Sequence, residues 1–344
     1  MDTRRTDLVF EGGGMKGIGL VGALSVLEEQ GYVAERRAGS SAGAIVAGLS
    51  AAGYRAQELH ALLAEMDFTR FLDKGWEDRI PVIGPPLSIL FQLGIYEGDE
   101  FERWLEDALA ARGVRTFADL RRDDDSADPR FHWSLQVVVS DVTAHEMLVL
   151  PRDAERKLGI DPDSLSVATA IRASMSIPIL FEPVRIADPR DGFEHVLVDG
   201  GMLSNFPVWV FDAEEPRWPT IGLLLVEGNP RSRVGKALDA PGEIGLKSIP
   251  AVRHVIALVQ TMMEAHDRLY IEQADFARTI PIETLGVGTT EFGLSPERRE
   301  ALYASGRRAA EKFLPFDFDG YRAAFRSGVR PTRRQAVSRL INGA

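Results

Sequence analysis

Short apolar strands and helical stretches alternate along the first half of the chain. Residues 8–10 are apolar and lead into a run of glycines, and residues 18–30 then carry apolar side chains at helical spacing up to Gly31. Residues 42–51 are almost all small or apolar, which predicts a buried helix that is stopped by Gly53. The beginning of the chain therefore repeats one unit, in which a strand leads through a turn into a helix.

Further apolar runs predict three more strands, at residues 135–139, 196–198 and 221–226. Strands that alternate with helices predict an α/β fold, here a three-layer α/β/α sandwich around a largely parallel central sheet. In such sheets, ligands and substrates bind beyond the carboxyl ends of the strands. The turns that follow these strands are therefore the first candidates for a functional site.

Residues 39–43 read Gly-Ser-Ser-Ala-Gly and fit the pattern GxSxG. In this pattern a sharp, strained turn from strand to helix exposes the hydroxyl of the central serine, which makes Ser41 the candidate nucleophile. Upstream, the consecutive glycines Gly12, Gly13 and Gly14 have no Cβ atoms and open a helix. Their backbone N–H groups are candidates for the oxyanion hole that an acyl-transfer serine needs.

The same glycines formally match the dinucleotide fingerprint GxGxxG, through Gly12, Gly14 and Gly17. A dinucleotide site, however, should carry an acidic residue about 20 positions later, at the end of a second strand. That interval leads here through Arg36 and Arg37 into the serine turn. The combination of both motifs therefore favours acyl transfer over dinucleotide binding.

A serine nucleophile needs a base, which is usually a histidine. None of the six histidines lies in a convincing catalytic context: His60, His132, His145, His195, His254 and His266. Three of them, His60, His254 and His266, lie in helical patterns and are expected to have surface or packing roles. The better candidate is Asp199, which ends an apolar strand and precedes Gly200 and Gly201. The alternative role for Asp199 is to initiate a turn before the two glycines.

These three blocks, in this order, resemble the signature motifs of the patatin-like phospholipases. The resemblance implies that Gly12 to Gly14 form the oxyanion hole, that Ser41 is the nucleophile, and that Asp199 is a base that works without a histidine. Two further stretches, residues 172–178 and 202–207, are similar to segments that pack beside the site in bacterial members. The implied activity is hydrolysis of phospholipids or other acyl lipids through an acyl-enzyme, with no cofactor and no metal.

The resemblance covers residues 7–226, which we expect to form the catalytic core, while residues 227–320 are expected to be a helical part packed on that core. Within the matching stretches, Pro178 and Asn205 are candidate substrate-binding residues. Lys16 is a third candidate, because its ammonium could attract an anionic headgroup; a solvated lysine at a helix start is the alternative.

Composition narrows the remaining functions of this 344-residue chain. A formal net charge of −11 argues against general nucleic-acid binding, and the absence of cysteine excludes disulfides and cysteine-bound metals. No uncharged apolar run is long enough for an ordinary transmembrane helix, and residues 1–6 contain no secretory signal. We therefore expect a cytoplasmic protein that associates at most peripherally with a membrane.

Two segments point towards a lipid surface. Residues 321–344 form a basic tail with six arginines and no acid, which predicts attraction to anionic membranes or packing on a partner: Arg322, Arg326, Arg330, Arg333, Arg334 and Arg339. Residues 80–95 are apolar and uncharged, and contain three prolines. They are expected to pack in the core or to form a flap over an acyl pocket.

Two other classes stay open at this stage. One is an α/β-hydrolase esterase with a histidine base, and the other is a non-catalytic protein that binds nucleotides or lipids and uses the serine only for the turn. The acyl position, the headgroup, and a requirement for a second copy of the chain or for an activating partner are not encoded in any pattern that we recognise.

Overall fold

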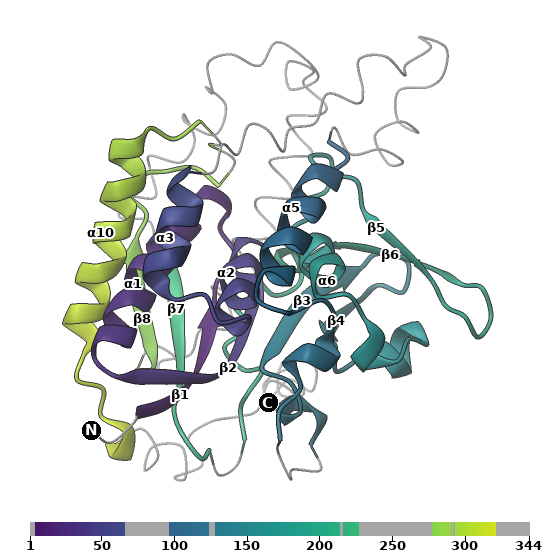
Figure 1. Ribbon diagram of the computed structural model, residues 1–344, viewed down its shortest axis with the longest axis horizontal. Coiled ribbons are helices and arrows are strands. Elements are labelled where there is room, and N and C mark those ends of the chain that lie inside the picture. The colour runs from purple at the N-terminus through teal and green to yellow at the C-terminus, as the bar shows by residue number, and fades with distance from the viewer. Residues whose placement is uncertain are drawn as a thin grey trace, which may run out of the picture.

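The computed structural model describes residues 4–65, 96–123, 128–213, 216–226 and 277–320, except for 290 and 292. Its centre is one mixed sheet of eight strands in the order β5-β6-β3-β2-β1-β7-β8, with β4 paired to β3 (Figure 1). Five neighbouring strands are parallel: β3 (Leu135–Asp141), β2 (Tyr32–Ser40), β1 (Arg4–Phe10), β7 (Thr220–Val226) and β8 (Thr279–Glu283). The antiparallel pairs involve β4 (Glu146–Leu150), β5 (Val184–Ala187) and β6 (Glu194–Asp199). The predicted α/β fold with a largely parallel sheet is confirmed.

The register of β3 places two strand ends next to each other. Strand β4 pairs with β3 without interruption from Val137 to Asp141, so it occupies one edge of β3. The other edge pairs with β2 up to Val138 and with β6 from Val139 onward. Because β2 runs parallel and β6 antiparallel to β3, their carboxyl ends meet at this junction.

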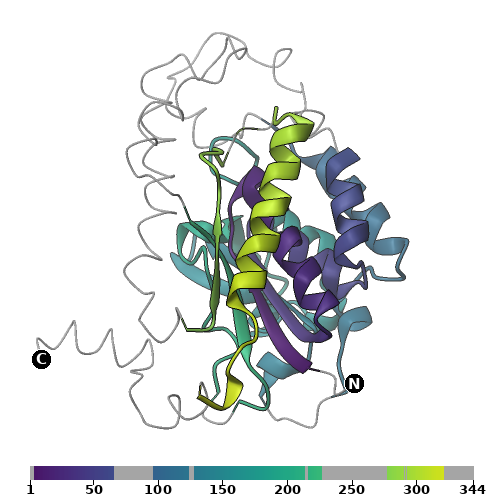
Figure 2. The ribbon, with the colours of Figure 1, turned by 90° about the vertical axis from the view of Figure 1, so that its left-hand side faces the viewer.

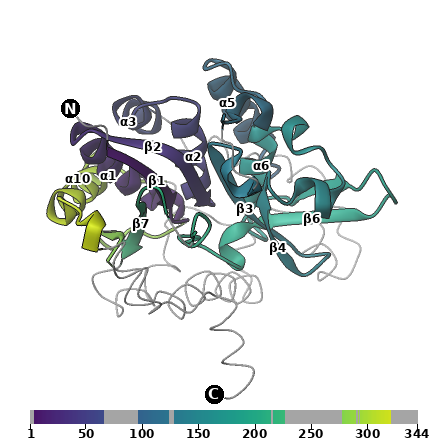
Figure 3. The ribbon, with the colours of Figure 1, turned by 90° about the horizontal axis from the view of Figure 1, so that it is seen from below.

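The described α-helices lie on one side of the sheet and contribute to one core (Figure 3). They are α1 (Ile18–Glu29), α2 (Ala42–Ala51), α3 (Ala56–Glu65), α5 (Asp99–Ala110), α6 (Val167–Ser174) and α10 (Pro296–Phe313). Short helical turns connect them at Gly14–Gly17, Phe117–Leu120, Pro129–Phe131, Ala154–Leu158, Pro162–Ser164 and Gly200–Met202. The opposite face is covered, among the described residues, by a second cluster around Phe206, Val208 and Phe211.

Strand β8 and helix α10 continue the sheet and the helical layer formed by residues 4–226. β8 pairs with β7, and α10 packs lengthwise along α1 at the edge of the molecule (Figure 2). The two helices approach very closely, since a Cβ atom on Gly22 would lie 2.0 Å from the Tyr303 carbonyl oxygen and one on Gly306 would lie 1.9 Å from the Gly19 carbonyl oxygen. The sequence pattern had not identified β8. Three of the segments discussed from the sequence lie outside the described residues: residues 80–95, residues 227–276 of the expected helical part, and the basic tail.

A buried ion pair between Asp7 and Arg36 joins β1 and β2. The Arg36 guanidinium donates to both carboxylate oxygens of Asp7, at 2.8 and 2.5 Å. It also lies over the rings of Phe131, Phe211 and Trp218. The side chains of Asp7 and Arg36 are almost fully buried, at 1% and 8% exposure.

Candidate active site

The predicted strand-to-helix turn is present at Ser41. Strand β2 ends at Ser40, α2 begins at Ala42, and Ser41 between them has φ 52° and ψ −129°. This is a strained conformation for a residue other than glycine. The flanking glycines make the turn sterically possible, because a Cβ atom on Gly39 would lie 2.4 Å from the Gly43 backbone, and one on Gly43 would lie 2.2 Å from the Phe10 carbonyl oxygen. Since α2 starts immediately after Ser41, its positive helix end points at the serine.

Ser41 and Asp199 are in direct contact although they are far apart in the sequence. The Ser41 hydroxyl donates to Asp199 Oδ2 at 2.7 Å, and the Gly201 N–H donates to Asp199 Oδ1, also at 2.7 Å. They meet because β2 and β6 end at neighbouring positions on the same edge of β3. Gly200 allows the chain to turn there, since a Cβ atom on it would lie 2.1 Å from the Val138 carbonyl oxygen.

Burial changes the acid-base properties of Asp199. The residue is completely buried, and loss of hydration raises the pKa of its carboxyl to about 7, while the hydrogen bonds from Ser41 and Gly201 act in the opposite direction. Among the described residues, no cationic group contributes to this pKa. Asp199 is therefore a stronger base than an aspartate with the ordinary pKa of about 3.9 that the sequence implied.

The glycine loop lies directly beside Ser41, and Asn205 holds its first member. The Gly12 N–H donates to the Asn205 carbonyl oxygen at 3.0 Å, and the Asn205 side-chain amide donates back to the Gly12 carbonyl oxygen, also at 3.0 Å. The same amide donates to Glu11 Oε1 at 3.2 Å, and Glu11 Oε2 accepts the Leu225 N–H. A Cβ atom on Gly12 would lie 2.9 Å from the Ser41 Cβ and 2.2 Å from Asn205 Oδ1, so the loop tolerates only glycine there.

The next two glycines differ from Gly12. Among the described residues, the N–H groups of Gly13 and Gly14 donate to no other group, whereas the Gly12 N–H is engaged by Asn205. Gly14 has φ +56°, and a Cβ atom on it would lie 2.0 Å from the Thr289 carbonyl oxygen. Only glycine fits this position, which begins the short helical turn Gly14–Gly17.

The three candidate substrate-binding residues have different surroundings. Lys16 is only 8% exposed, which contradicts the alternative of a solvated lysine at a helix start. Asn205 is buried and holds the glycine loop as described above. Pro178 lies half-buried after α6, next to an apolar cluster of Ile177, Leu180 and Phe181.

One contact of the nucleophile had no counterpart in the sequence analysis. The Ser41 backbone N–H donates to the hydroxyl of Ser174, at 3.0 Å. Ser174 belongs to the stretch 172–178 that was recognised only by its resemblance. A buried serine at the end of a helix carries no pattern of its own, so nothing in the sequence indicated this contact.

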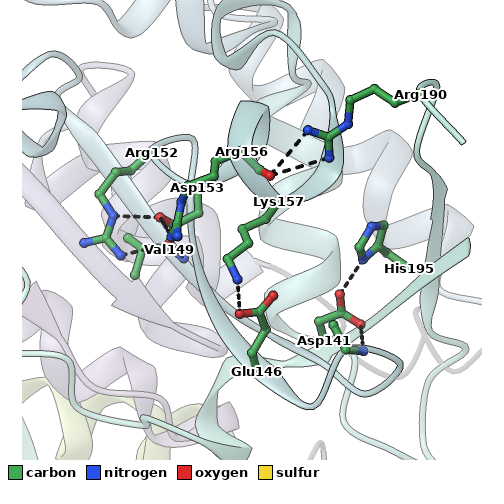
Figure 4. A network of polar contacts seen from close by, with 10 residues as sticks. Asp141, Glu146, Val149, Arg152, Asp153, Arg156, Lys157, Arg190 and His195 are labelled. Carbon is green, nitrogen blue, oxygen red and sulfur yellow. Dashed lines mark hydrogen bonds and ion pairs between the residues drawn. The ribbon is translucent and has the colours of Figure 1, made fainter. Parts of the chain in front are cut away.

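The described histidines are occupied elsewhere. Figure 4 shows the His195 ring turned toward Asp141, and its Nδ1 lies 2.6 Å from Asp141 Oδ2. His60 stacks on Tyr303 and contacts Glu300, and His145 lies in the turn between β3 and β4. In the described part of the chain, Asp199 is the partner of the Ser41 hydroxyl. His254 and His266 lie outside it.

Two negative findings complete the description of the site and its surroundings. Within the described ranges, no group of three or more histidine, aspartate or glutamate side chains is arranged to hold a metal ion. No helix among those residues has the length and apolar character that crossing a bilayer requires.

Comparison with known proteins identifies the family of the chain. Residues 8–212 match the family model of the patatin-like phospholipases. An uncharacterized Bacillus subtilis protein, YqhO, is 39% identical over 311 residues, which cover 90% of this chain and 97% of that protein. An uncharacterized NTE family protein of Mycobacterium tuberculosis is 28% identical over 61% of this chain and 29% of its own length. Among solved structures, VipD from Legionella pneumophila shares the fold, with a TM-score of 0.57 at 18% identity over 91% of this chain and 67% of its own. The chain therefore belongs to the patatin-like phospholipase family, whose members are lipid acyl hydrolases.

Proposed function

We propose that the protein hydrolyses acyl esters of phospholipids or related lipids with a dyad of Ser41 and Asp199. The observation that carries this proposal is the 2.7 Å hydrogen bond from the strained Ser41 to a fully buried carboxylate, beside which the described part of the chain places no cation. A carboxylate with a pKa of about 7 is well matched to accept a proton near neutral pH.

The reaction begins when the Ser41 hydroxyl gives its proton to Asp199 Oδ2 and its oxygen bonds to the ester carbonyl carbon. The carbonyl oxygen becomes an oxyanion, for which the N–H groups of Gly13 and Gly14 are the available donors of the glycine loop. The ester C–O bond then breaks, and the leaving alcohol takes the proton from Asp199. Water attacks the acyl-enzyme, passes a proton to Asp199, and the released Ser41 regains it.

Gly12 has a different role in this proposal. Its N–H is held by the Asn205 carbonyl oxygen, so Gly12 fixes the direction of the loop, and Gly13 and Gly14 bind the oxyanion. Lys16 follows the same loop and would interact with an anionic headgroup. The basic tail and the stretch 80–95 stay predictions about membrane contact and acyl binding.

The two competing classes have less support. An α/β-hydrolase mechanism needs a histidine at the serine. Among the described residues the Ser41 hydroxyl donates to Asp199 instead, and His60, His132 and His195 have other partners. A protein that used Ser41 only to form a turn would not need a carboxylate on its hydroxyl. It would also have no reason to bury that carboxylate without a compensating cation.

Labelling with a fluorophosphonate tests the proposal directly. We expect covalent labelling and hydrolysis of short acyl esters by the wild-type chain, with the adduct on Ser41 in peptide mapping. Ser41→Ala should lose both by at least about 10⁴-fold, because no other nucleophile is in place. Ser40→Ala is the matched control and should keep both, since the Ser40 hydroxyl has no hydrogen-bond partner among the described residues. An adduct on another serine would refute the dyad. A panel of lipids differing in headgroup and acyl position then defines the substrate.

A further inference from the structure

The end of helix α6 contacts the backbone of both dyad residues. The Ser174 hydroxyl accepts the Ser41 N–H at 3.0 Å, and two residues later the Ser176 carbonyl oxygen accepts the Asp199 N–H at 2.9 Å. Both serines are completely buried. A single turn of chain is thus bonded to the nucleophile and to its base, which come from different strands.

The Ser174 hydroxyl makes a second bond that completes this connection. It donates to the Val138 carbonyl oxygen at 2.6 Å. Val138 is the last β3 residue paired with β2, immediately before the pairing with β6 begins. The hydroxyl therefore joins Ser41 to the point of the sheet where the two strand ends meet, and its donor and acceptor capacities are both used.

Arg172 holds the same turn from the other side. It is only 3% exposed and donates to the carbonyl oxygens of Gly98, at 3.2 Å, and Glu182, at 3.1 Å, and also to the carbonyl oxygen of Glu97 and the hydroxyl of Ser176. The Ser176 hydroxyl in turn donates to the Arg172 carbonyl oxygen at 2.8 Å. The guanidinium thus fixes the turn to two neighbouring segments of chain, which makes it a rigid support.

We infer that Ser174 is a positioning residue for catalysis, whose hydroxyl holds the strained Ser41 backbone so that the serine hydroxyl meets Asp199. The inference rests on the proposed function of the dyad. A strained backbone conformation persists only where contacts with the surrounding structure hold it in place. For the Ser41 N–H, that contact is the hydrogen bond to the Ser174 side chain. The alternative is that Ser174 only satisfies buried backbone groups and stabilises the fold.

The test compares wild type, Ser174→Ala, Ser174→Thr and the control Ser140→Ala. Ser140 lies on β3 two residues beyond Val138, and its buried hydroxyl has no hydrogen-bond partner in the described structure. For each protein we would measure the rate of fluorophosphonate labelling, kcat and KM for a soluble ester, the pH dependence of kcat/KM, and the melting temperature. Assays are run well below the lowest melting temperature, so that every variant is folded.

We expect Ser174→Ala to lower kcat and the labelling rate by about 10- to 100-fold with KM changed less than about threefold, since a small displacement of a reacting group has effects of this size. Ser174→Thr keeps the hydroxyl and should recover most of the loss. The acid limb of the pH profile should move to higher pH in Ser174→Ala, because the Ser41 hydrogen bond lowers the pKa of Asp199 and a displaced serine weakens it.

Several outcomes would overturn the inference. One is a folded Ser174→Ala protein with kcat and labelling within twofold of wild type, and another is an equal loss in Ser140→Ala. A lower rate with an unshifted pH profile and no recovery by threonine would assign Ser174 a structural role only. If the wild-type chain itself is not labelled, the proposed dyad and this inference fail together; if wild type is labelled and Ser174→Ala behaves like it, only the inference fails.

Discussion

Two buried aspartates of the sheet illustrate how surroundings separate structural from chemical roles. Asp7 and Asp199 are both almost completely inaccessible to solvent. In both cases burial raises the pKa of the carboxyl. At Asp7 the Arg36 guanidinium opposes this by two hydrogen bonds and its charge. Asp199 has only the uncharged donors of Ser41 and Gly201.

We infer that a missing counter-charge among the described residues, and not burial alone, distinguishes the carboxylate of the proposed dyad. The Asp7 carboxylate is paired with a cation that is itself enclosed by aromatic rings. A pKa raised to about 7 suits Asp199 to take up and release a proton near neutral pH, and no charged group in the described ranges contributes to that pKa. Four experiments can break or sharpen this contrast.

The largest expected effect is the loss of turnover that the substitution Asp199→Asn causes. Asparagine keeps the shape of the side chain but cannot accept the Ser41 proton, so kcat for a soluble ester should fall by about 10³-fold. The measurement is steady-state kinetics, with circular dichroism to show that the fold is intact. Turnover within tenfold of wild type would mean that another group is the base.

The matching change at the other aspartate, Asp7→Asn, should affect stability and not chemistry. It leaves the Arg36 cation buried without its carboxylate, which we expect to lower the free energy of unfolding by about 3–5 kcal/mol. Urea unfolding measures this, and kcat per folded molecule should stay within twofold. Arg36→Met added to Asp7→Asn should restore much of the loss. A stability change below about 1 kcal/mol would contradict the structural role of the pair.

The stability of Asp199→Asn relative to wild type should depend on pH. The pKa of Asp199 is about 7 in the folded protein, and in the unfolded chain it has the ordinary value of 3.8. At a pH between these two values, the folded state therefore binds more protons than the unfolded state. The contribution of Asp199 to stability is therefore full below pH 4 and is lost as pH rises through 7. Asn does not titrate, so the variant should gain stability over wild type between pH 5 and 8, by an amount of up to about 3 kcal/mol. Melting curves across this range measure the gain, and a constant difference would exclude a raised pKa.

The smallest expected effect is that of His195→Gln, which tests the histidine alternative. The His195 ring contacts Asp141, whose other carboxylate oxygen accepts the N–H groups of Thr143 and Ala144 at 2.9 and 3.1 Å. Loss of the ring should lower stability by about 1 kcal/mol and leave kcat within about threefold. A loss as large as that in Ser41→Ala would identify a triad mechanism.

The positions of the site that only glycine fits could be predicted from the sequence. Glycines at 12, 14, 39, 43 and 200 stand where a Cβ atom would lie within 2.4 Å of another atom. The need for glycine falls on single positions of the sequence, even where the crowding atom comes from a distant segment, and it therefore leaves motifs that can be recognised. The strand-to-helix turn at Ser41 and the helix after the glycine loop were predicted for this reason, and both are present.

Other features depend on contacts between distant segments, which leave no local pattern. Three features of the site arise only in the folded chain. They are the hydrogen bond from the Gly12 N–H to Asn205, the hydrogen bond between Ser41 and Ser174, and the burial of Lys16. Strand β8 was missed because its identity depends on its pairing with β7, 53 or more positions earlier. A short apolar segment takes the strand conformation only when an edge is available to it.

The sequence by itself determined which residues can turn, which can attack and which can accept a proton, because these are properties of single side chains and of backbone sterics. Only the tertiary structure decided that Ser41 and Asp199 meet, since β2 and β6 end side by side on β3. The tertiary structure also decided the pKa of the Asp199 carboxyl. The identity of an aspartate fixes an ordinary pKa of 3.8, but removal of water by the surrounding core raises the pKa of Asp199 to about 7.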